Sequence, residues 1–183
     1  MSNMKVMPEK IIATVCMLLR KSESVQEILL GYKTKKFCKF RWVLNGGQWE
    51  TDESLKRCAQ RELFEETGIR AEPEDLEKRA VIVFHNQREG GTPVIIEVHV
   101  YVCMKWSGKP EEKDPGLICH TWFPIEGLPE KIPFADKEWI PMVAAGKHIA
   151  GEVWYADGNV DVCIGDPIWE EVVMFVENDA NTR

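Results

Sequence analysis

Three glutamates near the middle of the chain are spaced so that they project from one face of a helix. Glu62, Glu65 and Glu66 stand at positions i, i+3 and i+4, which become neighbours within one helical turn. Earlier on that face lie Leu55 and Cys58, so an apolar, inward-facing stripe changes into a cluster of carboxylates. Like charges this close repel one another, and the cluster therefore needs a cation. Hard oxygen ligands without histidine or cysteine favour Mg²⁺ or Mn²⁺, which can bridge phosphate oxygens and activate water to cleave a phosphoanhydride.

A solvent-exposed helix offers a simpler interpretation of the same glutamates. Glutamate-rich amphipathic helices are common, and Arg61 stands four residues before Glu65, where the two would pair on any exposed helix. The wider pattern favours a metal site. It starts at Gly47, continues through Glu53 and ends with the string 61–69, a set of fixed spacings that chance seldom supplies in a chain of 183 residues.

This stretch resembles the signature of the Nudix hydrolases at each of its defining positions. The resemblance implies an α/β fold, namely an α/β/α sandwich with a mixed central sheet, and Mg²⁺-dependent hydrolysis of a nucleoside diphosphate linked to another moiety, with Mn²⁺ as the other metal. The implied metal ligands are the Gly46 carbonyl and the carboxylates of Glu62, Glu65 and Glu66. Of the implied catalytic groups, Glu65 or Glu66 would activate water, Arg61 would orient the glutamates and Glu53 would support them.

Residues on both sides of the signature resemble one subgroup of the family, the mammalian-type 8-oxo-dGTP diphosphatases. The stretch 29–33 and the pair 41–42 follow that subgroup's order. The implied nucleotide pocket is lined by Thr14, Lys33, Phe37 and Phe84. Val43 stands where the subgroup has a base-reading asparagine, so Asn45 and Asp136 become the candidates for contacting the base. The implied partner is a purine nucleoside triphosphate, oxidised or not, cleaved to the monophosphate and pyrophosphate.

Two alternatives stay open. The same chemistry could act on another nucleoside diphosphate derivative, such as an unmodified triphosphate or a nucleotide sugar. The chain could also be a binding module that keeps the fold without turnover, but such modules usually lack one of the signature glutamates, and here all are present. Neither the preferred base nor the oligomeric state follows from the sequence.

Length and composition favour one compact domain over residues 1–183, with a core over about residues 10–170 and frayed ends. Lys and Arg number 23 against 30 Asp and Glu, and the net charge of −7 disfavours proteins that coat nucleic-acid polymers or membrane surfaces. Six cysteines form no CxxC pair, which indicates reduced thiols. Such thiols suit a cytoplasmic protein, and the longest apolar run, 11–19, is too short to span a bilayer.

The glutamate helix has clear end signals in the sequence. Asp52 or Thr51 is expected to cap its start, because short polar side chains satisfy the free N–H groups there. The helix should end at Thr67, since Gly68 suits the left-handed conformation that follows a helix. The stretch 45–47, Asn-Gly-Gly, predicts a loop before the helix.

Apolar runs predict the strands that position this helix. The polar residues 21–26 predict a hairpin with a five- or six-residue loop. In the run 94–103, alternation predicts one buried face and one facing a cleft, with His99 the only histidine directed there. The predicted order is β-β-β-α-β-β-β-α-β-β, with strands at 11–19, 28–32, 41–44, 76–84, 94–103, 119–123, 152–155 and 160–164 and a second helix at 136–145.

Overall fold

The computed structural model describes residues 7–87 and 91–175. Its strands are β1 (Glu9–Ser22), β2 (Val25–Lys33), β3 (Trp42–Val43), β4 (Asn45–Gln48), β5 (Leu76–Gln87), β6 (Pro93–Cys103), β7 (Leu117–Pro124), β8 (His148–Ala156), β9 (Asn159–Cys163) and β10 (Ile168–Val172). Its helices are α1 (Leu55–Thr67) and α2 (Asp136–Ala144), with short 3-10 turns η1 (Pro73–Asp75) and η2 (Ile125–Gly127). The fraying expected of both chain ends falls largely outside the described residues.

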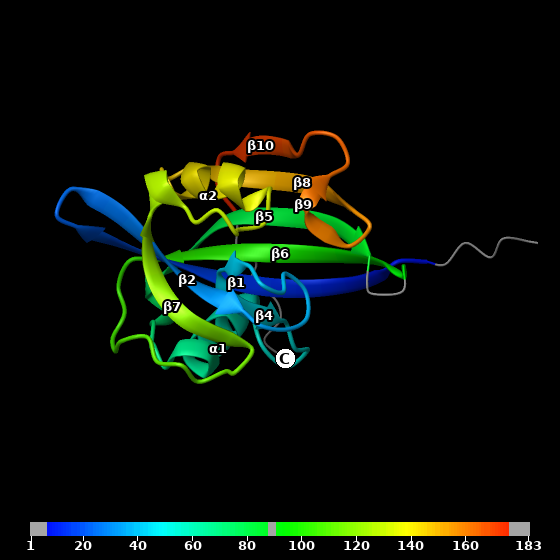
Figure 1. Cartoon of the computed structure of the whole chain (residues 1–183). Helices are drawn as coiled ribbons and strands as arrows, with labels where there is room; N and C mark the ends of the chain where they lie inside the picture. The colour runs from blue at the N-terminus through cyan, green and yellow to red at the C-terminus, as the bar shows by residue number, and fades with distance from the viewer. Residues whose placement is uncertain (1–6, 88–90, 176–183) are drawn as a thin grey trace, which may run out of the picture.

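All these strands belong to one curled sheet (Figure 1). Along the sheet the order is β10-β8-β5-β6-β1-β2-β3, while β4, β7 and β9 pair with β1, β2 and β8. The pairs β1–β6 and β5–β8 are parallel and the others antiparallel. The sheet is therefore mixed, as predicted.

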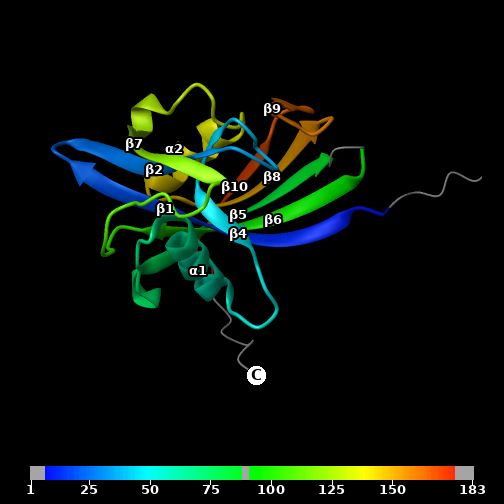
Figure 2. The same ribbon diagram turned by 60° about the horizontal axis from the view of Figure 1, so that its bottom comes forward.

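The two helices lie on opposite sides of the sheet (Figure 2). Because successive side chains of a strand point to opposite faces, β1 contributes to both layers. Met17 and Leu19 join the core beneath α2, whereas Cys16 and Leu18 join the core beneath α1. This arrangement confirms the predicted α/β/α sandwich. Within the described residues, neither helix has the length and apolar character needed to cross a membrane.

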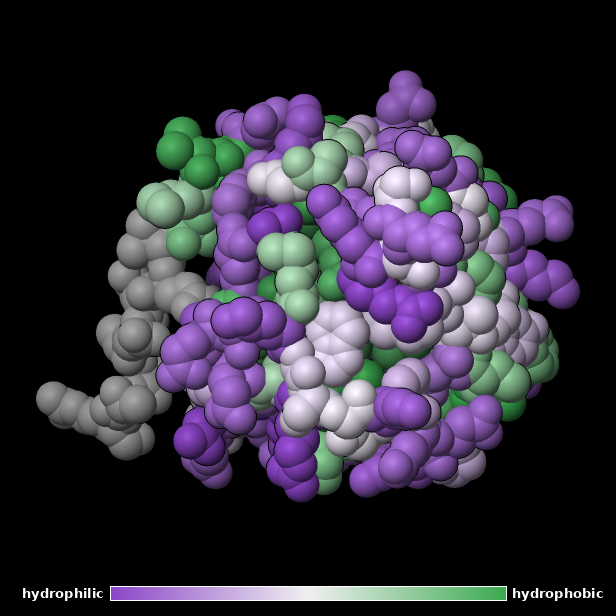
Figure 3. Space-filling view, turned by 90° about the vertical axis from the view of Figure 1, so that its left-hand side faces the viewer, coloured by the Kyte–Doolittle hydropathy of each residue, from purple (hydrophilic) through white to green (hydrophobic). Residues whose placement is uncertain are grey.

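The first hairpin corrects one sequence-based expectation. The strands β1 and β2 continue through the polar residues and leave only Glu23 and Ser24 as the turn, with Glu23 at a φ of 57°. The prediction of a five- or six-residue loop was therefore wrong. Arg20 and Glu27 face each other across the hairpin and form an ion pair at 2.7 Å, so these polar residues are paired within strands. Figure 3 views this end of the molecule and shows hydrophilic side chains over much of it.

The Asn-Gly-Gly stretch before α1 is also not the predicted loop. It forms β4, which pairs antiparallel with β1, so that Gly46 lies opposite Val15 and Gly47 opposite Thr14. A Cβ on Gly46 would overlap the Thr14 backbone. Glycine permits a close approach between two strands here, which sequence signals for turns cannot distinguish from a loop.

Strand β6 departs from the predicted pattern of one buried and one open face. Both faces are buried from His99 to Cys103. Val100 and Val102 belong to the core that contains α2 residues, and Tyr101 and Cys103 belong to the core that contains α1 residues. The prediction treated the strand as half exposed, but it lies in the middle of the sheet. Strand β10, at the sheet edge, was not predicted.

Candidate active site on the glutamate helix

Helix α1 is held in place by its caps and its buried side. Its N-cap is Ser54, whose hydroxyl accepts from Arg57 N at 3.2 Å, so the predicted Asp52 or Thr51 cap was wrong. Gly68 ends the helix at a φ of 75°, as predicted. Ala59 and Leu63 pack into the core between the helix and the sheet. The helix is thereby fixed in rotation, and the carboxylates of Glu62 and Glu66 face strand β4.

Arg61 binds several of the predicted carboxylates at once. Its guanidinium donates to both oxygens of Glu53, at 2.6 and 3.1 Å, to Glu62 Oε1 at 2.7 Å and to Glu65 Oε2 at 3.3 Å. Burial works to raise the pKa of Glu53, but hydrogen bonds from Arg61 and from the Glu50 backbone outweigh it and hold that pKa below its ordinary value. Arg61 is placed where it can orient the glutamates.

Glu66 is the most buried of the three helix glutamates, and strand β4 reaches it directly. The Gly46 N–H donates to Glu66 Oε2 at 2.8 Å. Burial raises the pKa of the Glu66 carboxyl to about 8, even though Lys33 lowers it. Gly47 lies against the Glu62 carboxylate so closely that a Cβ there would overlap it. The two glycines therefore let the backbone of β4 pass within contact distance of two carboxylates.

A pocket of about 430 Å³ opens at this point, and both acidic and basic side chains line it. It is lined by Lys33, Lys36, Gly46, Gly47, Gln48, Trp49, Glu50, Glu62, Glu66 and Asp114. Sequence reasoning had not assigned Lys36 or Asp114. Asp114 precedes β7, and its Oδ1 accepts from the Gly116 N–H at 2.7 Å. Its only signal in the sequence was a carboxylate shortly before the strand that became β7.

Carboxylate oxygens around this pocket suit a hard divalent cation. Glu66 is a buried carboxylate with a raised pKa, so a positive charge beside it would relieve an unfavourable burial. Within the described parts of the chain, no three acidic, histidine or cysteine side chains are gathered tightly enough to form a ready metal site. Glu62 is drawn toward Arg61, Glu66 binds Gly46, and the Glu65 side chain is 56% exposed. The donor set fits Mg²⁺ or Mn²⁺.

Two of the predicted nucleotide-binding residues lie near Tyr155 on the α2 side of the sheet. Phe84 on β5 packs against this core and stacks on Tyr155, with ring centroids 5.9 Å apart and planes at 1°. Asp136 begins α2 and accepts from Trp139 Nε1 at 2.8 Å. Burial raises the pKa of Asp136 to about 7.

The remaining predicted residues lie apart from that aromatic pair. Thr14 is fully buried and donates to Cys58 Sγ of α1 at 3.1 Å. Asn45 is fully buried too, and its Oδ1 lies 2.8 Å from His120 Nε2. Phe37 is half-buried in the segment between β2 and β3. The structure therefore brings Lys33 to the carboxylates but does not bring Thr14 or Asn45 to Phe84.

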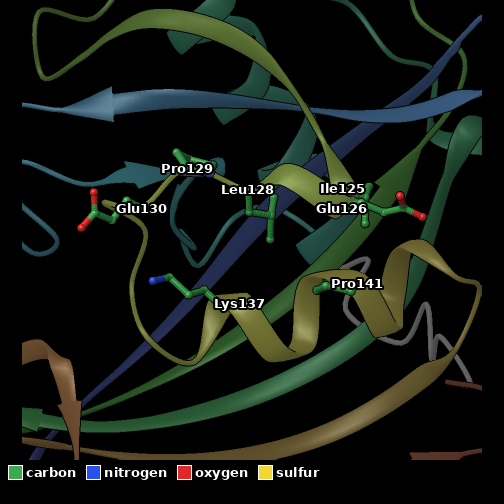
Figure 4. A pocket seen from close by; sticks show the side chains of 7 residues that line it. All are labelled: Ile125, Glu126, Leu128, Pro129, Glu130, Lys137 and Pro141. Atoms are coloured by element: carbon green, nitrogen blue, oxygen red, sulfur yellow. The ribbon is translucent and has the colours of Figure 1, made fainter.

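The histidines are arranged differently from the prediction. His99 is 7% exposed and pairs with Glu97 at 2.8 Å, so it does not face an open cleft. His120, which the sequence did not single out, contacts Asn45 immediately before Gly46. Burial lowers the pKa of His120. A second recess, also of about 430 Å³, lies between η2 and α2 and contains none of the predicted residues (Figure 4).

Comparison with known proteins agrees with this arrangement. Residues 10–143 match the family described as NUDIX domain. The oxidized purine nucleoside triphosphate hydrolase of Danio rerio is 30% identical over 125 residues, which cover 68% of this chain and 76% of that protein. The protein of the same name from Mus musculus is 30% identical over 137 residues, which cover 72% of this chain and 81% of that protein.

Solved structures share the fold. The Mutator MutT protein from Bacillus halodurans superimposes with a TM-score of 0.69 at 20% identity and covers 87% of this chain and 97% of that one. The MutT NUDIX hydrolase from Burkholderia pseudomallei superimposes with a TM-score of 0.60 at 22% identity and covers 74% of this chain and 95% of that one. With the family match over most of the chain, these findings show that the protein belongs to the Nudix family of hydrolases, which act on pyrophosphate bonds.

Proposed function

We propose that this Nudix hydrolase cleaves purine nucleoside triphosphates, including oxidised ones such as 8-oxo-dGTP, to the monophosphate and pyrophosphate. The observation that carries the proposal is the pocket in which Lys33 and Lys36 stand beside Glu62 and Glu66. Two ammonium groups suit a phosphate chain, and the carboxylates suit the cation that accompanies it. The shared name of the two relatives at 30% identity supports an oxidised purine as the base.

Mg²⁺, with Mn²⁺ as the substitute, would neutralise charge on the phosphates and make bound water a better nucleophile. Glu62, Glu65, Glu66 and the Gly46 carbonyl are the groups that would hold it. Arg61 binds Glu53 and Glu62 and so would limit the positions that these two carboxylates can take. Lys33 and Lys36 would bind the phosphate oxygens and keep the scissile bond beside the helix.

A proton must leave the attacking water, and a helix carboxylate is the group available to take it. Glu65 is the more exposed of the two candidates, and its only ion pair in the described residues is with Arg61, at 3.3 Å. Glu66 lies deeper, and burial raises the pKa of its carboxyl, so a cation beside it would favour the charged form that can take a proton. We assign the proton transfer to this pair of residues without separating them.

The base would be held apart from the phosphates. Phe84 offers a ring for stacking, and Asp136 offers a carboxyl that can accept or donate a hydrogen bond near neutral pH because its pKa is raised to about 7. Phe37 lies on the segment between Lys33 and β3. This segment would connect the residues that bind the phosphates to those that bind the base. Thr14 and Asn45 would affect nucleotide binding indirectly, by holding α1 and β4 in position.

The test is a panel of nucleotides with Mg²⁺, scored for pyrophosphate and orthophosphate separately. We expect 8-oxo-dGTP to be cleaved faster than dGTP, with pyrophosphate as the second product and no turnover in EDTA. Glu66→Gln should lower the rate about a hundredfold, which corresponds to about 3 kcal/mol in the barrier. Glu126→Gln, the same exchange in the other recess, is the matched control and should retain parent activity.

Several results would contradict the proposal. If a nucleotide sugar is cleaved fastest, the proposed substrate is wrong. If orthophosphate is the only phosphate product, the proposed position of the cleaved bond is wrong. Equal rates on 8-oxo-dGTP and dGTP would reject the preference for an oxidised base. A Glu66→Gln variant that is as fast as the parent would remove Glu66 from the site.

A further inference from the structure

Tyr155, near the end of β8, carries a buried hydroxyl. The residue is 6% exposed, and its O–H donates to no acceptor among the described residues, while the Ala135 backbone N–H interacts with its oxygen. A buried O–H donor without an acceptor destabilises the folded protein. Phenylalanine would fill the same space and stack on Phe84 equally well. The hydroxyl therefore needs an explanation other than packing.

The neighbouring strand β9 and two segments distant in sequence surround this phenol. Strand β9 lies beside it, with Cys163 in register with Tyr155. The start of α2 brings Asp136, and the segment between β2 and β3 brings Cys38, both of which influence the phenol electrostatically. Cys38, Asp136, Cys163 and Phe84 are only partly buried, so the cluster reaches the surface.

An ion pair ties two of these segments together. Arg41 donates through Nε to Asp161 Oδ1 at 2.8 Å, and its second nitrogen contacts the other carboxylate oxygen. The Phe134 N–H donates to the Val160 carbonyl at 2.9 Å, which joins the approach to α2 to β9. These contacts connect the segments that surround Tyr155.

We propose that Tyr155 determines base specificity in this enzyme, its hydroxyl donating to a carbonyl oxygen on the edge of a 6-oxopurine while Asp136 receives a neighbouring ring N–H. This inference rests on the proposed function. Tyr155 is a hydrogen-bond donor here because burial raises the pKa of its phenol well above the ordinary value and keeps it protonated. The nucleobase would supply the partner that the hydroxyl lacks in the free protein.

The test compares Tyr155→Phe with the parent on 8-oxo-dGTP, dGTP, dATP and dCTP. We expect kcat/KM to fall about tenfold on the two guanine nucleotides, through KM with kcat nearly unchanged, and to change less than about twofold on the other two. Thermal stability without nucleotide should stay the same or rise, because the variant removes an unsatisfied buried group. Tyr32→Phe is the matched control: its ring packs on Trp42, and the same loss of a hydroxyl should leave every substrate unaffected.

The outcomes separate this inference from the proposed function. Parent activity across the panel tests the function, and the ratio of variant to parent tests Tyr155. A parent that prefers 8-oxo-dGTP together with an unchanged Tyr155→Phe would overturn the inference alone. Equal losses on all four nucleotides with a lower melting temperature would make the hydroxyl structural and also overturn it. A parent inactive on all purine triphosphates would overturn both.

Discussion

Asp136→Asn tests the electrostatic environment at the start of α2. The Asp136 carboxyl accepts the Trp139 indole N–H at 2.8 Å, and an asparagine oxygen can accept the same bond. The exchange therefore removes the titrating group and retains the hydrogen bond. Burial raises the pKa of Asp136 from 3.8 to about 7. Over the interval between these values, the folded protein keeps a proton that the unfolded chain has lost.

This difference sets the size of the effect. It amounts to about 3 pH units, and each unit is worth about 1.4 kcal/mol, so burying the charge costs at most about 4 kcal/mol. Because the side chain is partly accessible to solvent, we expect about half of that, roughly 2 kcal/mol. Below about pH 4 both states are protonated and the cost is absent. It grows as the pH rises and is complete above about pH 7.

Thermal unfolding of the parent and Asp136→Asn at pH 4 and pH 8 measures this effect. At pH 8 the variant should melt roughly 4–8 °C above the parent, and at pH 4 the two should coincide after correction for any pH-independent difference. Asp166→Asn makes the same exchange at an exposed position and serves as the control. A difference between Asp136→Asn and the parent that is constant from pH 4 to pH 8 would refute the reasoning.

Three further predictions concern α1 and the strand beside it. Gly47→Ala should reduce kcat about tenfold or more while circular dichroism stays the same, because the added Cβ displaces the Glu62 carboxylate; unchanged kinetics would mean that this carboxylate can move freely. Ser54→Ala should cost about 1 kcal/mol in urea unfolding through loss of the N-cap bond, and no loss would show that Asp52 can replace it. Millimolar Mg²⁺ should raise the melting temperature of the parent more than that of Glu66→Gln, because the variant lacks one proposed ligand. Equal increases in the two proteins would place the metal elsewhere.

The local sequence was sufficient to predict helix α1 and its row of glutamates. The i, i+3, i+4 spacing of Glu62, Glu65 and Glu66 places them on one face of any helix, and Gly68 ends that helix because its backbone adopts a φ of 75°. The apolar runs likewise predicted eight of the strands, since burying one or both faces of a strand requires them. These features depend on neighbours within one or two helical turns, or along one strand, and are therefore legible in the sequence.

The tertiary structure decided which distant residues meet. Gly46 and Gly47 have the composition of a loop, but pairing with β1 makes them a strand against the glutamates. Asp114 lines the pocket beside Glu62 and Glu66 only because β7 pairs with β2, which brings the segment before β7 beside Lys33.

The aromatic cluster on the α2 side shows the same dependence. Tyr155 reaches Phe84 through the parallel pairing of β8 with β5, and it reaches Asp136 because α2 packs on that face. Burial then raises the pKa of Asp136 and leaves the Tyr155 O–H without an acceptor among the described residues. Contacts between residues far apart in the chain, and the desolvation that they cause, exist only once the sheet has formed, and no local pattern in the sequence encodes them.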